Sequence, residues 1–211
     1  MLTGQRFTAL RSVSGGVIPS VGAGWAPGKR ARWTVPGLLL ALVGLHLFSL
    51  LSTPEPFVDE AWYASRAWAL IQSGRPFGML DAGVFDRYDG YWTTFPWLGP
   101  WFYSLAIRLL GLSLFSVRLT SLGFGLALLG ASSVLANRLY GARVGLLAVL
   151  LVSLSNVFLH SSHMARHDIV VAAFGFGAIA LYLSDRGSAF PARSILSGLA
   201  VGLAFDVHPN A

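Results

Sequence analysis

The sequence predicts an all-α polytopic membrane protein, and three observations support this fold class. Hydrophobic residues make up 55% of the 211 residues and only 11% are charged, which is a more apolar balance than soluble globular proteins have. Mean hydropathy is correspondingly high, at +0.63. Several uncharged runs are also long enough to cross about 30 Å of hydrocarbon, which takes roughly 20 helical residues. Together these observations exclude an ordinary soluble enzyme and a disordered chain.

The charged residues indicate a lipid bilayer, and no nucleic acid, as a partner. Lysine and arginine outnumber aspartate and glutamate by 15 to 9. The basic residues flank the apolar runs instead of forming one patch interleaved with aromatic side chains. The chain has no cysteine, which excludes a disulfide framework, a thiolate nucleophile and a cysteine-bound zinc ion.

The first 32 residues form a basic tail that precedes the first apolar run. They hold five basic side chains and no acid, so the positive-inside rule places this tail in the cytoplasm. Its richness in Gly, Ser and Pro predicts disorder. The first spanning helix, about 33–52, then runs outward. A cleaved signal peptide is the alternative, but the run is longer than a signal core and no small-residue cleavage site follows it.

Residues 53–118 are expected to form an acid-rich outer loop with interfacial helices. The stretch 61–72 could rest on the membrane surface, since it carries Trp62 and Trp68. The apolar stretch 97–107 would reach only about 16 Å as a helix, too short to span. Its Trp97 and Trp101 suit the headgroup boundary, which favours a helix lying in the interface.

Four further runs are interpreted as spanning helices, at about 119–137, 144–162, 169–184 and 194–207. With 97–107 treated as non-spanning, the basic loops 138–143 and 186–193 lie in the cytoplasm, as the positive-inside rule requires. The loop 160–168 then lies outside, beside the acid-rich loop. A spanning 97–107 would reverse all three loops. Because the chain ends shortly after the last run, we expect it to be part of a larger membrane protein.

Asp59 and Glu60 stand just outside the first span and are the first candidate site. Paired carboxylates at a membrane rim can bind a divalent ion or remove a proton from an acceptor hydroxyl. The alternative is structural: Asp59 would be the N-cap of the next helix, and Glu60 would favour the positive end of its dipole.

The segment 160–168 is the second candidate site. Arg166 could hold phosphate oxygens bidentately; the alternatives are a local pair between Arg166 and Asp168, and Asp168 as N-cap of a helix from Ile169. His160, His163 and His167 share one helical face if the segment is helical, so a metal site must be weighed. No cofactor is certain. If a divalent metal ion binds, the weak candidate ligands are Asp59, Asp168, His163 and His167.

Short motifs in a particular order carry a family resemblance. They are VDEAWYA at 58–64, FPWL at 95–98, GLSLFSVRL at 111–119, YGARVG at 140–145, ARHD at 165–168 and GLAVGLA at 198–204. Their order and spacing resemble the family 39 glycosyltransferases, which are the dolichyl-phosphate-mannose protein mannosyltransferase and aminoarabinose transferase group with the GT-C fold. The resemblance covers 33–211 and implies an N-terminal, truncated GT-C module.

This resemblance implies a site and an activity. Family members transfer a sugar from a polyprenyl-phosphate donor to an acceptor hydroxyl on the outer face of the cell membrane. Asp59 matches the catalytic base, Glu60 its neighbour, Asp168 the acid of the second outer loop, and Arg166 a position that faces the donor phosphate. The sequence departs from the family at Phe95, where members often have Lys or His, and in its length, since members are usually more than twice as long.

Two further expectations can be stated. The four charged residues Asp59, Glu60, Arg166 and Asp168 should line one cavity at the outer face, because two intervening helices return the chain to the same side. The alternative function is that of a polytopic transporter or channel component, since ionisable residues near a membrane often line a path. Against it, the interiors of the spanning runs are nearly free of charge and no matching pair of broken helices is present.

Overall fold

The computed structural model describes residues 31–78, 80, 97–183 and 192–208, and these residues form helices without a strand. The helices are α1 (Ala31–Ser49), α2 (Val58–Ser73), α3 (Leu98–Leu110), α4 (Leu114–Tyr140), α5 (Ala142–Ser153), α6 (Asn156–Ser162), α7 (His167–Tyr182) and α8 (Ala192–Val207). The all-α prediction is confirmed. The predicted disorder of the tail, the acids Asp81, Asp86 and Asp89, the Phe95 departure and most of the loop 186–193 lie outside the described residues.

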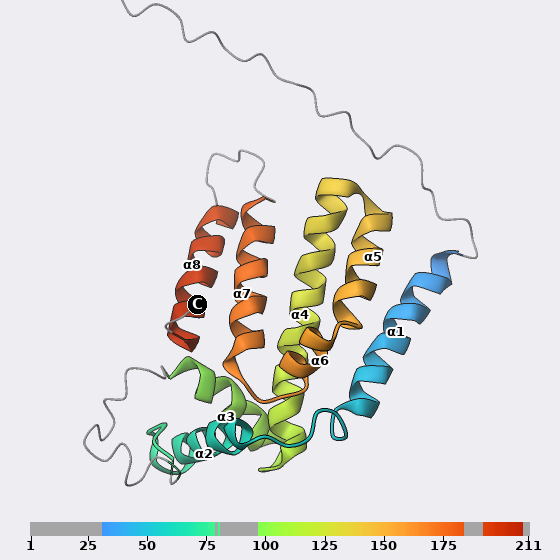
Figure 1. Ribbon diagram of the computed structural model, residues 1–211. Helices are drawn as coiled ribbons and strands as arrows, with labels where there is room; N and C mark the ends of the chain where they lie inside the picture. Colours follow the sequence, from blue (N-terminus) through green and yellow to red (C-terminus); the bar gives the residue numbers. More distant parts are fainter. Residues whose placement is uncertain (1–30, 79, 81–96, 184–191, 209–211) are drawn as a thin grey trace, which may run out of the picture.

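The helices α4, α5, α7 and α8 stand side by side, while α2 and α3 lie across one end of this group (Figure 1). At the opposite end, Arg138 donates a hydrogen bond to the carbonyl oxygen of Leu183 at 3.0 Å. The last turns of α4 and α7 therefore meet far from α2. The basic residues that end α4 and the acidic residues that begin α2 are thus at opposite ends of the bundle.

The second outward run, predicted as one span over 144–162, is broken into α5 and α6. The two helices meet at an angle of 68°, so the prediction of one continuous helix is wrong. The break follows from Ser155, whose side-chain oxygen accepts a hydrogen bond from the Phe158 amide at 3.2 Å and so caps a new helix.

Among the described helices, α4 is long and apolar enough to cross a membrane. Its 27 residues reach about 40 Å. The bent α5–α6 pair would be a second crossing if counted as one span, while α7 and the 35–49 part of α1 are apolar but shorter.

The surface of the bundle is apolar, and several charged or polar side chains are inside it. Phe48 is 87% exposed and Leu109 is 83% exposed, whereas Arg118 and His163 are completely buried. A soluble monomer rarely exposes large apolar patches, so this distribution fits a bundle surrounded by lipid.

Close helix packing depends on Gly125 of α4. A Cβ atom at this position would lie 2.8 Å from the Cβ of Ser162 and 3.1 Å from the Phe158 ring. Only glycine therefore lets α6 approach α4 this closely. This contact fixes the direction in which the chain leaves α6 toward the second candidate segment.

A buried cluster of α2, α3 and α4 holds the crossing helices in place. Its members are Tyr63, Ala67, Tyr103, Ile107, Val117 and Ala165. Ala165 belongs to the connection between α6 and α7, so the same cluster brings that connection against α2. The next residue along the chain is Arg166.

Candidate active site

The helix α2 begins with both acidic residues of the first candidate site in its first turn. Phe57 is the N-cap, and Asp59 and Glu60 are the second and third helical residues. The Phe57 amide donates to Glu60 Oε2 at 3.1 Å. The interpretation of Asp59 as N-cap is therefore wrong, because Glu60 satisfies the cap amide. Both carboxylates still face the positive end of the helix dipole.

Glu60 forms a buried ion pair with Arg118 of α4. Arg118 Nε donates to Glu60 Oε1 and Nη2 donates to Oε2, each at 2.8 Å. The Arg118 side chain is 0% exposed and that of Glu60 is 3% exposed. Two parallel hydrogen bonds of this kind are the strongest geometry for an arginine and a carboxylate.

The same pair fastens two other parts of the chain. Arg118 Nη1 donates to the Leu50 carbonyl at the end of α1 at 2.8 Å. Glu60 Oε1 also accepts from the Ala165 amide at 3.1 Å. Because both oxygens of Glu60 are occupied, this carboxylate holds the site together and is not open to a substrate. Sequence reasoning missed Arg118, although an arginine near the start of a long apolar helix was a signal.

Asp59 lies in a second, more exposed cluster with Arg166 and Asp168. Arg166 Nε is 3.4 Å from Asp59 Oδ2 and 3.1 Å from Asp168 Oδ2. The three side chains are 28%, 38% and 45% exposed for Asp59, Arg166 and Asp168. The structure thus brings these three predicted residues together across about a hundred positions of sequence. Glu60 is turned toward Arg118 instead, so the expectation that all four charged residues line one cavity is wrong.

Two details of the second candidate segment differ from expectation. The helix α7 begins at His167 with Arg166 as its N-cap, so the interpretation of Asp168 as N-cap of a helix from Ile169 is wrong. The guanidinium of Arg166 lies between the carboxylates of Asp59 and Asp168. The local pair between Arg166 and Asp168 is present, and it is shared with Asp59.

The histidines do not form the one-face array that a continuous helix would give. His160 is in α6 and exposed, His163 ends α6, and His167 begins α7. His163 Nδ1 lies 3.0 Å from the Thr53 carbonyl and Nε2 lies 3.0 Å from His46 Nδ1. Both of its nitrogens are therefore in use.

The described residues do not fit a metal site. Among them, no three His, Asp or Glu side chains are grouped to hold an ion. The carboxylates of Asp59 and Asp168 face the positive charge of Arg166 instead.

Two buried tyrosines adjoin the exposed cluster. Tyr63, one helical turn after Asp59, is hydrogen-bonded to His167 Nδ1. Tyr103 donates to the Arg166 carbonyl at 2.9 Å. Burial raises the pKa of Tyr63 above its usual value, and the charges of Asp168 and Asp59 raise it further. Burial likewise raises the pKa of Tyr103, so both phenols keep their protons and act as donors.

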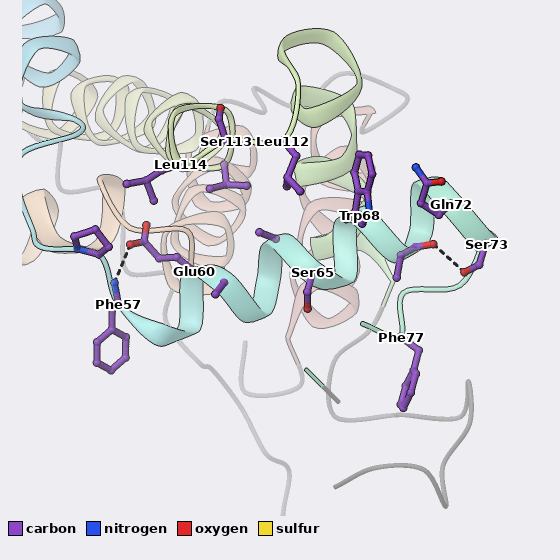
Figure 2. A pocket seen from close by; sticks show the side chains of 15 residues that line it. Phe57, Glu60, Ser65, Trp68, Gln72, Ser73, Phe77, Leu112, Ser113 and Leu114 are labelled. Atoms are coloured by element: carbon purple, nitrogen blue, oxygen red, sulfur yellow. Dashed lines mark hydrogen bonds between the residues drawn. The ribbon is translucent and has the colours of Figure 1, made fainter. Parts of the chain in front are cut away.

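A cavity of about 680 Å³ lies between α2 and the turn that joins α3 to α4 (Figure 2). Its lining is mostly apolar and includes Phe57, Trp68 and Leu114. Glu60 lies on its wall, with the hydrogen bond to the Phe57 amide visible in Figure 2. Asp59, Arg166 and Asp168 are not among its lining residues, so the cavity and the exposed acidic cluster are separate features.

Comparison with known proteins identifies the fold and the family. The crystal structure of ArnT from Cupriavidus metallidurans in the apo state matches with a TM-score of 0.61 and 22% identity, over 82% of this chain and 33% of that chain. The chain has the GT-C fold of ArnT and spans about a third of its length. No curated protein sequence matches. A family model for dolichyl-phosphate-mannose-protein mannosyltransferases matches residues 95–211, which include Arg166 and Asp168. Because this match covers more than half of the residues, the chain belongs to the dolichyl-phosphate-mannose-protein mannosyltransferase family.

Proposed function

We propose that this chain is part of a membrane glycosyltransferase that moves a sugar from a polyprenyl-phosphate donor to an acceptor hydroxyl. One observation carries the proposal. Two carboxylates from distant elements, Asp59 and Asp168, share the guanidinium of Arg166 at one end of an apolar-surfaced bundle. The helices of this bundle can lie in lipid, and the charges at their end are partly exposed. A guanidinium there is suited to bind a phosphate, and a carboxylate is suited to take the proton of a nucleophilic hydroxyl.

Arg166 is the group that would bind the donor phosphate. Its Nε lies near both carboxylates but is buried without a hydrogen-bond partner among the described residues, so this guanidinium has a donor to offer phosphate oxygens. A guanidinium binds phosphate in this planar, two-pronged manner. Asp168 would then hold Arg166 from the opposite side and limit its movement.

Asp59 would act as the general base. Arg166 contacts its Oδ2, and Oδ1 has no hydrogen-bond partner among the described residues. The acceptor oxygen attacks sugar C1 while Asp59 takes its proton, and the bond between C1 and the phosphate oxygen breaks with its electron pair going to the phosphate. A single displacement of this kind inverts C1 and requires one base.

The orientation of this site follows from charge. The basic tail and the basic end of α4, near Arg138, favour the cytoplasm by the positive-inside rule. Asp59 and Arg166 belong to the starts of α2 and α7, and this end of the bundle is opposite to the end of α4 (Figure 1). We therefore assign the site to the outer face of the cell membrane, in a multi-pass protein with its N-terminus in the cytoplasm. The family match counts against the alternative of a transporter or channel component.

The proposal is tested with membranes from cells that make the full-length protein. They are incubated with labelled polyprenyl-phosphate sugars, and transfer is compared between wild type, Asp59→Asn and Glu55→Gln. Glu55 is an exposed acid of the same segment and is the matched control. We expect Asp59→Asn to lower turnover by about 10²-fold or more, the usual effect of losing a general base, with donor binding retained. Wild-type turnover in Asp59→Asn would contradict the proposal.

A further inference from the structure

The imidazole of His167 is held by residues from α2, α7 and the end of α8. Tyr63 of α2 is hydrogen-bonded to its Nδ1, and its Nε2 lies 3.3 Å from Asp168 Oδ1. The ring of His208 stacks on it, with centroids 3.7 Å apart and planes 1° from parallel. Rotation of the His167 ring would break all three contacts. The ring is therefore fixed in both position and plane.

The proton positions follow from Tyr63. Burial raises the pKa of Tyr63 above its usual value, so the phenol stays protonated and donates to His167. Neutral His167 then accepts at Nδ1 and carries its hydrogen on Nε2, since the partner of one ring nitrogen decides the state of the other. The nitrogen that carries this hydrogen lies 3.3 Å from Asp168 Oδ1.

Asp168 therefore has a neighbour at each oxygen: His167 Nε2 lies 3.3 Å from Oδ1 and Arg166 Nε lies 3.1 Å from Oδ2. Arg166 itself is 38% exposed, and a partly exposed guanidinium keeps its orientation only if its partner is fixed. The surface pair alone is weak, worth about 0–1 kcal/mol. An immobile Asp168 supplies the missing constraint.

We infer that His167 is a positioning residue, which fixes the Asp168 carboxylate and thereby keeps Arg166 turned toward Asp59 and a bound phosphate. The inference rests on the proposed function, because it assigns the phosphate to Arg166. It adds that donor affinity depends on a residue that does not itself contact the donor. Tyr63 serves the same purpose by setting the tautomer of His167.

The test measures binding of polyprenyl monophosphate to the purified full-length protein in detergent, together with sugar transfer. The variants are His167→Phe, which removes both ring nitrogens, and His167→Gln, whose amide N–H can replace Nε2–H toward Asp168. The control is His160→Phe, since His160 is exposed on α6. Melting temperatures of all variants show whether the protein is folded.

We expect His167→Phe to weaken binding about tenfold, because Arg166 must then be ordered when the phosphate binds, at a cost of about 1.4 kcal/mol. His167→Gln should stay within a few-fold of wild type, and His160→Phe should equal it. A purely structural role would lower the melting temperature without changing the affinity of the folded protein. Equal affinity in His167→Phe and wild type, or a His167→Gln variant as weak as His167→Phe, would overturn the inference alone. A wild-type protein that neither binds the phosphate nor transfers sugar would overturn the proposed function as well.

Discussion

Replacing Arg118 by leucine is expected to destabilise the protein far more than changing any charge of the exposed cluster. The Arg118 side chain is 0% exposed and makes three hydrogen bonds, two to Glu60 and one to the Leu50 carbonyl. Removing one partner of a buried pair leaves the other charge without compensation and costs about 3–5 kcal/mol. We therefore expect Arg118→Leu to lose about this much.

The matched control is Asp168→Asn, which breaks an ion pair whose side chains are 38% and 45% exposed. Exposed pairs of this kind contribute about 0–1 kcal/mol. Glu60→Gln should resemble Arg118→Leu, because the amide group of glutamine would place N–H hydrogens against the donors of Arg118. The measurement is thermal unfolding of the protein in detergent, followed by tryptophan fluorescence. A loss in Arg118→Leu no larger than in Asp168→Asn would refute the buried-pair reasoning.

Three further predictions concern topology, packing and pH. Tyr140→Cys introduces a single cysteine at an exposed position of the basic end of α4, and a thiol reagent should label it only from the cytoplasmic side. Labelling only from outside would reverse the assigned topology. Gly125→Ala should lower the free energy of unfolding by about 1–3 kcal/mol through overpacking against Ser162. Gly130→Ala, with open space around it, should be neutral or stabilising. Equal thermal stability of the two variants would contradict the close approach of α6 to α4. Burial lowers the pKa of His163, so the unfolded state binds more protons below about pH 6.5 and stability should fall as the pH drops through that region. Melting temperatures across pH should show a smaller fall in His163→Asn, and an unchanged fall would be evidence against this contribution.

The sequence could predict that Asp59, Glu60, Arg166 and Asp168 lie at the same end of the bundle, because this depends only on topology. Two crossings between α2 and α7 return the chain to the same end, whatever the details of packing. The helix positions follow equally from apolar runs, as α4 and α8 illustrate. Hydropathy and charge are local properties, and they are sufficient for these two conclusions.

The pairing of Glu60 with Arg118 could not be predicted in the same way. Neighbouring residues in the first turn of a helix point to different sides of it. Which of them meets Arg118 depends on how α2 crosses α4. The sequence therefore allowed a substrate role for Glu60, whereas the structure turns its carboxylate toward Arg118. The bend after α5 was missed because its cause is also local packing and capping. A single serine such as Ser155 does not visibly interrupt an uncharged, mostly apolar run.

The central claim is that Asp59 and Asp168 act as one unit through Arg166, and a double-mutant cycle on sugar transfer tests it most directly. Turnover is measured for wild type, Asp59→Asn, Asp168→Asn and the double variant. Residues that act as a unit are strongly non-additive. If the two carboxylates act as one unit, the double variant is about as slow as the slower single variant. Losses that multiply, as they do for independent sites, would contradict it.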